Sequence, residues 1–268
     1  MDRFIEANGI RMRYRIDGAG PDLVLVHGVG AQLESWDGVV ARLGGRFRCI
    51  AYDLRGHGAT DKPVGPYSID GFAADLAGLM DALGVARCHL AGFSLGGLIG
   101  QRFALDYADR LDRLALLRAI AGRTEEERAR VAARLEVVES GAPGDHFEKS
   151  LPRWFTDGYL RDHPDVIAEA RAQNQRNDPQ AYAAAYRVLA TAEMIDELAN
   201  IEAPTLVATG AGDLGSTPRM SRVMHERIAG SELHILADLR HSILTEAPDR
   251  VGALLADFLR PGGPRPLA

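Results

Sequence analysis

The chain has 268 residues, of which 46% are hydrophobic and 25% charged, an ordinary composition that leaves room for one large α/β domain or two smaller ones. A formal net charge of −6 disfavours nucleic acid as a partner, because the phosphate backbone is itself negative. No run of residues approaches the roughly 18 apolar positions of a membrane-spanning helix, and the first residues lack the apolar core of a signal peptide, so we expect a cytoplasmic protein with no membrane partner.

The chain opens with a β-hairpin that we expect to turn at Asn8-Gly9, a pair that adopts the left-handed backbone of such turns. Apolar runs of strand length recur after it. They lie at 22–26, 48–52, 88–92, 111–119, 204–209 and 231–236. Runs that are apolar throughout are typical of strands buried on both faces, so these predict a mainly parallel sheet.

Segments with helical spacing separate the strands. Residues 35–43 predict a short helix that Ser35 caps, and residues 67–84 predict a longer helix that ends at Gly84. From about 120 to 200 the sequence is rich in Arg, Glu and Ala and shows helical patterns without a clear strand. This stretch interrupts the alternation of strands and helices, which resumes after it.

The alternation predicts an α/β fold with helices on both faces of the sheet. We expect a core of residues 1–119 and 201–260, a helical insertion over 120–200, and a loose tail over 261–268. Parallel strands end at one edge of a sheet and ligands gather there, so the residues that follow each strand are the candidates for function.

The segment "GFSLGG" stands where a strand passes directly into a helix. Gly-x-Ser-x-Gly in that setting is typical of a nucleophile elbow, a strained turn that exposes the serine hydroxyl. Gly92 and Gly96 leave room for the turn, and the helix directs its N-terminus at Ser94, where negative charge is favoured. The sequence therefore predicts Ser94 as a nucleophile.

A serine hydroxyl needs a base that takes its proton. His241 follows the last strand, and Asp213 follows the strand before it. Ser94, Asp213 and His241 thus occur in the chain order of the Ser-His-acid triad of α/β hydrolases. Asp213 is expected to hold the imidazole in the correct tautomer.

An oxyanion hole completes the expected site. One donor is the backbone N–H of Leu95, the residue after the nucleophile, and the other is the N–H of Val29, in the glycine-rich loop after the strand at 22–26. His27 is expected to shape that loop.

Five motifs in chain order resemble those of the α/β-hydrolase superfamily: "VHGVG", "YDLRGHG", "GFSLGG", "TGAGDLGSTP" and "LRHSILTEAP". Within it, the chain is most similar to the 3-oxoadipate enol-lactonases and their close esterase relatives, through "GFSLGGLIGQRFAL", "RWFTDGYL" and "NDPQAYAAAYRVLATAEMIDELANIEAPTLV". The resemblance implies an α/β-hydrolase fold with a mostly parallel eight-stranded sheet, in which residues 120–200 form a helical lid.

The resemblance also implies hydrolysis of a small lactone or carboxylic ester through an acyl-enzyme, without metal or organic cofactor, in aromatic catabolism. The residues expected to line the substrate pocket are Trp154, Phe155, Tyr159, Tyr186 and Met194. Arg118 and Arg153 are candidates for pairing with a substrate carboxylate. Arg118 is also a departure, because the family more often has a small or polar residue there.

Two alternatives stay open from the sequence. One is a hydrolase that cleaves C–C bonds of ring-fission products with the same triad, and the other is a non-catalytic receptor for a small molecule on the same fold. The oligomeric state is open as well, with a homodimer among the alternatives.

Cys49 and Cys88 each lie in an apolar strand. In the fold that the resemblance implies, the strand ending at His27 separates them. Two strand spacings of about 9–10 Å are too long for a disulfide, so we expect two buried free thiols.

Overall fold

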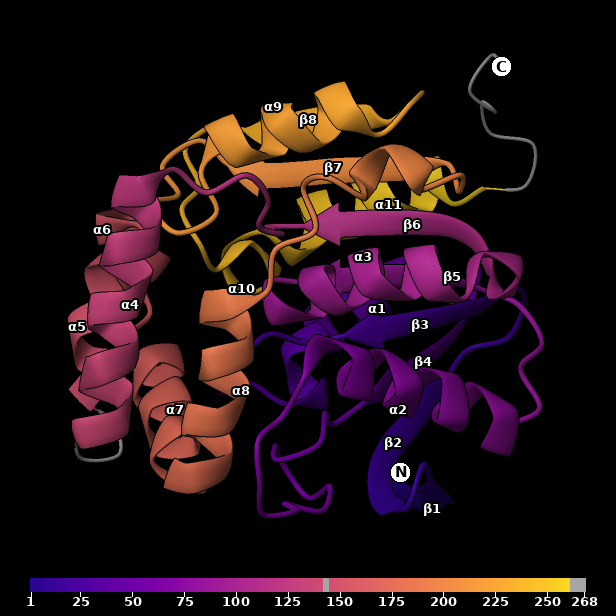
Figure 1. The fold of residues 1–268 in the computed structure, drawn as a ribbon, viewed down its shortest axis with the longest axis horizontal. Helices are drawn as coiled ribbons and strands as arrows, with labels where there is room; N and C mark the ends of the chain where they lie inside the picture. Colours follow the sequence, from indigo (N-terminus) through magenta and orange to yellow (C-terminus); the bar gives the residue numbers. More distant parts are fainter. Residues whose placement is uncertain (142–144, 261–268) are drawn as a thin grey trace.

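A computed structural model describes residues 1–141 and 145–260 of the chain. The expected loose tail, 261–268, lies outside these ranges. The described chain forms an eight-stranded sheet in the order β1-β2-β4-β3-β5-β6-β7-β8 (Figure 1). The strands are β1 (Arg3–Ala7), β2 (Ile10–Asp17), β3 (Asp22–Val26), β4 (Arg48–Tyr52), β5 (Cys88–Phe93), β6 (Leu111–Leu117), β7 (Thr205–Gly210) and β8 (Glu232–Leu236).

The sheet is mostly parallel, as expected. β1 and β2 pair antiparallel, β2 pairs antiparallel with β4, and every later neighbour pair is parallel. The hairpin between β1 and β2 turns at Asn8-Gly9, with φ of 47° and 76°. Both values lie in the left-handed region that the tight two-residue turn requires.

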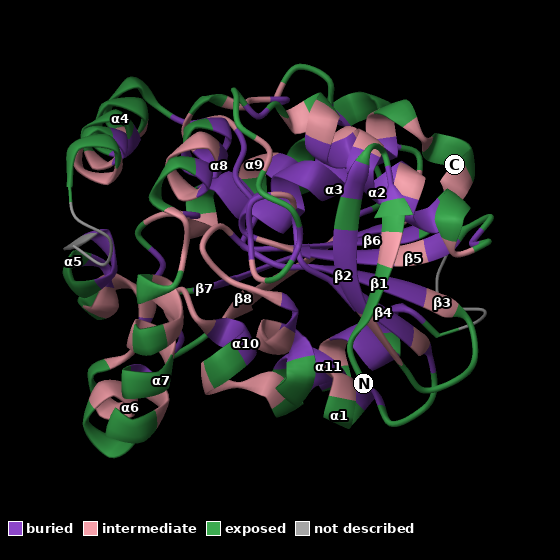
Figure 2. Cartoon of the chain, turned by 90° about the horizontal axis from the view of Figure 1, so that it is seen from below, coloured by how far each residue is buried: buried purple, intermediate pink, exposed green. Residues whose placement is uncertain are grey.

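The central strands are apolar along their whole length because both faces of the sheet are covered. In β3, Leu23 and Leu25 pack into the core on one face, while Val24 and Val26 pack into the core on the other. Figure 2 shows α1, α10 and α11 on one side of the sheet and α2, α3 and α9 on the other. These helices are α1 (Asp37–Leu43), α2 (Ile69–Ala82), α3 (Leu95–Asp106), α9 (Pro218–Arg227), α10 (Ile243–Glu246) and α11 (Pro248–Phe258).

Local signals set both ends of α2. Ser68 Oγ accepts a hydrogen bond from Gly71 N (3.0 Å) and caps α2, and Gly84 follows that helix with φ +68°. The predicted cap Ser35 is wrong. It lies inside a short 3-10 helix, η1 (Leu33–Trp36), and Trp36 precedes α1. The sequence pattern does not distinguish this 3-10 turn from the start of an α-helix.

The described residues between 125 and 191 contribute helices and no strand, at the end of the sheet where the parallel strands finish (Figure 1). We call these helices the helical insertion. They are α4 (Glu125–Ser140), α5 (Asp145–Trp154), α6 (Asp157–Asp162), α7 (Pro164–Gln175) and α8 (Pro179–Thr191). Short 3-10 helices, η2 (Ala108–Arg110) and η3 (Leu198–Asn200), stand outside it. Buried residues of α4 and α8, such as Val131 and Ala185, join the larger core.

Cys49 on β4 and Cys88 on β5 are buried and free, with β3 between their strands, as expected. No helix in the described ranges combines the length and apolarity needed to cross a bilayer.

Candidate active site

Ser94 occupies the turn between β5 and α3. Its φ of +56° and ψ of −112° are strained for a residue with a side chain. A Cβ on Gly92 would lie 2.1 Å from the carbonyl oxygen of Gly96, and a Cβ on Gly96 would lie 2.2 Å from that of Val26. Only glycine fits at both positions. The two glycines of the Gly-x-Ser-x-Gly pattern are therefore required by the close packing of the turn that holds Ser94. Ser94 precedes α3 but makes no capping hydrogen bond with its side chain.

Asp213 lies in the loop after β7 and is buried. Its Oδ1 accepts hydrogen bonds from the backbone N–H groups of Gly215 (2.7 Å) and Ser216 (3.2 Å). Thr209 Oγ1 donates to Oδ2 at 3.4 Å. These bonds fix the carboxylate in place.

His241 lies in the loop after β8, with Nδ1 3.7 Å from Asp213 Oδ1. This separation is longer than a hydrogen bond. The ring packs edge-on against Phe93 at 5.5 Å between centroids and stacks on Trp154 at 5.9 Å. Asp213 is thus the carboxylate beside the imidazole.

The environment of His241 keeps it neutral. Burial lowers the pKa of His241 well below its usual value, and the positive charges of Arg118, Arg153 and Arg134 lower it further, in that order. A neutral imidazole is the form that accepts a proton, so His241 is in the state that a general base requires.

Ser94, Asp213 and His241 line one cavity of about 510 Å³ between the sheet and the helical insertion. The loop after β3 forms part of its wall through Gly28 and Val29. A Cβ on Gly28 would lie 3.1 Å from Ser94 Cβ, so this loop packs directly against the serine. Three loops from distant parts of the chain therefore meet at one place.

The two residues expected to supply the oxyanion donors lie in segments that meet at Ser94. Val29 lines the cavity, and Leu95 is the first residue of α3. The N–H groups of the first helical turn have no acceptor within the helix, so the Leu95 N–H is available to a ligand.

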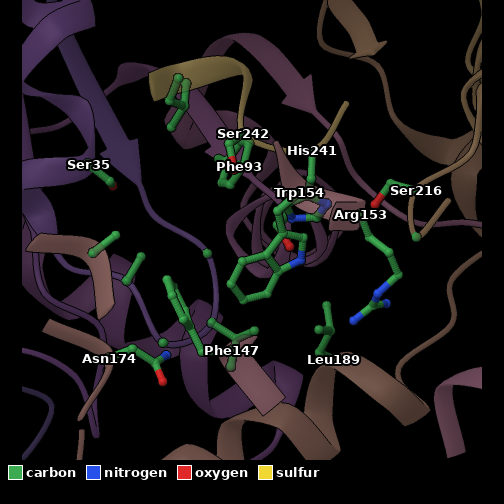
Figure 3. Close-up of a pocket in the computed structure, with 18 of the residues that line it drawn as sticks. Ser35, Phe93, Phe147, Arg153, Trp154, Asn174, Leu189, Ser216, His241 and Ser242 are labelled. Carbon is green, nitrogen blue, oxygen red and sulfur yellow. The ribbon is translucent and has the colours of Figure 1, made fainter. Parts of the chain in front are cut away.

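The insertion supplies the opposite wall of the cavity. Trp154, Phe155, Arg153 and Tyr186 line it, as the sequence analysis expected. Figure 3 shows Trp154 between His241 and Phe147, with Arg153 beside it. Phe147 packs edge-on against the indole at 5.6 Å.

Two expected pocket residues lie elsewhere. Tyr159 stacks on Phe155 at 5.6 Å and on His163 at 4.2 Å, and its hydroxyl reaches the carbonyl oxygen of Thr245. Met194 is buried in the larger core. Neither lines the cavity, because their side chains pack between elements of the fold instead.

Arg118 also departs from the expected role. Its side chain is fully buried and pairs with Asp213, and it is absent from the cavity wall. The physical reason is its place in the sheet. Ser94 N donates to Leu117 O (2.9 Å) and Arg118 N donates to Ala208 O (2.7 Å), so the end of β6 is enclosed between β5 and β7. The expectation that Arg118 binds a substrate carboxylate is corrected.

Arg134 on α4 was missed by the sequence analysis. It lines the cavity and donates from Nε to Tyr186 Oη at 3.3 Å. Arg153 donates to Ser150 Oγ at 2.5 Å. Within residues 1–141 and 145–260 neither guanidinium has a carboxylate partner. The spacing of Glu127, Val131 and Arg134 places them on one helix face and is the signal that predicts this wall.

His146 is a further cavity residue that was not expected from the sequence. It lines the cavity, with Nδ1 3.0 Å from Tyr182 Oη and its ring 4.9 Å from that of Tyr186. Burial lowers its pKa to about 4. His27 is buried and accepts from Leu54 N at Nε2 (3.0 Å), which fits the expected structural role in its loop.

No group of three or more His, Cys, Asp or Glu side chains with the arrangement of a metal site occurs among the described residues.

Comparison with known proteins gives concordant matches. A family model described as the alpha/beta hydrolase fold matches residues 21–248. The 3-oxoadipate enol-lactonase 2 of Acinetobacter baylyi is 29% identical over 234 residues, which are 87% of this chain and 87% of that protein.

Two solved structures are similar over nearly their whole length. The enol-lactonase from Burkholderia xenovorans LB400 superposes with a TM-score of 0.90 at 34% identity, covering 96% of this chain and 99% of that one. The meta-cleavage product hydrolase from Pseudomonas fluorescens IP01 superposes with a TM-score of 0.84 at 26% identity, covering 96% and 97%.

Proposed function

The chain belongs to the α/β-hydrolase family, and from this premise we propose that it is a serine hydrolase of small lactones or carboxylic esters. In this proposal Ser94 is the nucleophile, His241 the general base and Asp213 the residue that orients the imidazole. The observation that carries the proposal is that the strained Ser94 and the neutral His241 line one cavity.

The reaction has two halves. Ser94 Oγ attacks the carbonyl carbon while His241 takes the hydroxyl proton, and the backbone N–H groups of Val29 and Leu95 hold the oxyanion. The C–O bond then breaks, and His241 gives its proton to the leaving oxygen, which opens a lactone ring or releases an alcohol. A water that His241 deprotonates attacks the acyl-enzyme, and its proton passes through the imidazole to Ser94 as the acid leaves.

The substrate proposed is a compact lactone that carries a carboxylate, as the similarity to enol-lactonases favours. Arg153 and Arg134 present guanidinium groups without carboxylate partners in the described chain, and they suit that group. Trp154 and Phe147 form an apolar wall for the ring. The segment 120–200, which contains the helical insertion, is the proposed lid over this site.

A second candidate is hydrolysis of a C–C bond in a ring-fission product. The similarity to a meta-cleavage product hydrolase favours it, and it uses the same three side chains. A non-catalytic receptor is the third reading. A cytoplasmic location and a role in aromatic catabolism belong to the proposal as well, whereas the oligomeric state stays open, with a homodimer among the alternatives.

The experiment compares the wild type with Ser94→Ala on p-nitrophenyl acetate, a panel of carboxylated and neutral lactones, and a ring-fission product. We expect wild-type turnover of a lactone or ester and a loss of about 10³-fold or more in kcat for Ser94→Ala, because the nucleophile is removed. Ser221→Ala is the matched control, because Ser221 is a buried serine away from the cavity.

Three other outcomes would change the assignment. Turnover that survives Ser94→Ala contradicts the serine mechanism. Turnover of the ring-fission product alone supports the C–C hydrolase. Tight binding without turnover of any compound supports the receptor.

A further inference from the structure

Arg118 is an unusual residue for its position. It follows β6 directly, between the loops that carry Ser94 and Asp213, with φ +57° and a side chain that is completely buried. A fully buried guanidinium is costly unless a negative charge compensates it. The groups around the Arg118 side chain must therefore account for the burial of its charge.

Those surroundings contain one carboxylate. Arg118 Nη2 contacts Asp213 Oδ2, and Asp213 is the only carboxylate at ion-pair distance from Arg118 in the described chain. Its guanidinium carbon lies 5.9 Å from the centre of the Phe93 ring. None of its three side-chain nitrogens makes a hydrogen bond to a described residue, Asp213 included, so the contact between the two side chains is electrostatic. The charge of Arg118 is therefore directed at Asp213.

Asp213 consequently faces two cations when His241 is protonated. Oδ2 is beside Arg118, while Oδ1 is 3.7 Å from His241 Nδ1. An ion pair between Arg118 and Asp213 is close to neutral as a unit. It therefore attracts an imidazolium less strongly than an isolated carboxylate does.

The other charged groups around His241 do not reverse this effect. Arg153 from α5 and Arg134 from α4 add further positive charge. On the same segment as His241, Arg240 pairs with Asp157, and Glu246 accepts hydrogen bonds from Thr156. The described aromatic side chains that pack against the ring, Phe93 and Trp154, are uncharged.

We propose that Arg118 is a positioning residue that holds Asp213 through its second oxygen, weakens the pull of this carboxylate on the imidazolium, and so extends the working range of the enzyme to more acidic pH. The inference rests on the proposed function, because it assigns Asp213 and His241 their roles. Burial and Arg118 act in the same direction on the pKa of His241, with burial the larger cause. Replacing Arg118 therefore measures how much of the lowering of the His241 pKa comes from the charge of Arg118.

The test titrates His241 directly, by NMR of protein labelled with ¹⁵N-histidine, with the His241→Gln variant used to assign the signal. We expect His241 in the wild type to titrate below the usual histidine value of about 6.5. In Arg118→Met the midpoint should rise by on the order of one pH unit, since a buried positive neighbour is lost. Arg118→Lys keeps the charge and should shift less than half as far.

Arg102→Met is the control, because it removes an arginine that pairs with Asp106 and Glu197 outside the cavity, and the midpoint should stay unchanged. Near-ultraviolet circular dichroism checks that each variant is folded. Where Arg118→Met does not fold, Arg118→Gln removes the same charge with a polar side chain. The acidic limb of kcat/KM should move together with the titration.

Two results overturn the inference. One is a wild-type midpoint at or above about 6.5. The other is a folded, uncharged variant whose midpoint equals that of the wild type. The titration requires no turnover, so it stands apart from the proposed function. If the serine mechanism is wrong, Ser94→Ala keeps its turnover. If the inference is wrong, the titration midpoint of His241 alone shows it.

Discussion

At the scale of single residues, Asp213 contacts two different groups. It accepts hydrogen bonds from the backbone N–H groups of Gly215 and Ser216, lies beside His241, and contacts the buried guanidinium of Arg118. A change at Asp213 is therefore expected to affect both the chemistry and the stability of the fold.

Asp213→Asn should lower kcat by roughly 10³- to 10⁴-fold, because an amide favours the wrong tautomer of His241. It should also cost about 3 kcal/mol of unfolding free energy, since Arg118 then lacks its carboxylate. Steady-state kinetics and urea denaturation measure the two effects. The double variant Arg118→Met/Asp213→Asn is the control and should recover most of the stability but none of the activity. Equal stability of wild type and Asp213→Asn would contradict the ion pair.

Arg153 offers a residue-scale test of the substrate class. Its guanidinium lines the cavity and donates to Ser150. Arg153→Met should raise KM for a carboxylated lactone about 10- to 100-fold, because a charge-assisted hydrogen bond is lost. A neutral lactone of the same size is the internal control and should show little change. A similar loss for both substrates would indicate a packing role instead.

At the scale of elements, the helical insertion is attached to the loop that carries His241. Arg240 Nη1 donates to the carbonyl oxygens of Pro152 and Phe155 and to Asp157 Oδ1, each at 2.8 Å. Glu246 accepts hydrogen bonds from Thr156 N and Oγ1. The junction of α5 and α6, next to Trp154, is thus held over the imidazole.

Arg240→Ala should loosen this junction. We expect kcat/KM to fall about ten-fold, equivalent to about 1.4 kcal/mol, because Trp154 no longer stays over the site. Acrylamide quenching of tryptophan fluorescence checks the cause. Trp36 is fully buried, so increased quenching reports Trp154. Arg250→Ala removes only one long bond, to Ala237 O (3.4 Å), and serves as the matched control. Unchanged quenching in Arg240→Ala would contradict the anchoring.

At the scale of the whole molecule, buried neutral histidines make the free energy of unfolding depend on pH. His27 and His57 are buried, with ring centroids 5.2 Å apart, and burial lowers their pKa values to about 4 and about 3. Each titrates near 6.5 when unfolded, so the unfolded chain binds more protons at mildly acidic pH. The stability they contribute is complete above about pH 6.5 and is lost as the pH falls toward 4.

We therefore expect the unfolding free energy to be level above about pH 7 and to drop at pH 5 by about 2 kcal/mol for each of these two histidines. Urea denaturation at a series of pH values measures this. His57→Gln removes one titrating group and should make the drop at pH 5 smaller by about 2 kcal/mol. The same unfolding free energy at pH 7 and pH 5 would contradict the account.

Several features follow from the sequence alone because they depend on short-range patterns. The hairpin at Asn8-Gly9, the buried strands and the turn around Ser94 each need particular residues at fixed spacing. Chain order and strand ends were also enough to nominate Asp213 and His241, since parallel strands finish at one edge of a sheet. The family resemblance rested on the same motifs, and the comparisons confirm it.

The tertiary structure decided which side chains face the cavity. Arg118 follows strand β6, and Arg134 lies on helix α4. Arg118 is enclosed behind Asp213, whereas Arg134 lines the cavity. Tyr159 and Met194 likewise pack within the fold. Local periodicity gives the face of an element, but the neighbour that covers this face comes from a distant part of the chain, and only the packed arrangement of sheet and insertion determines it.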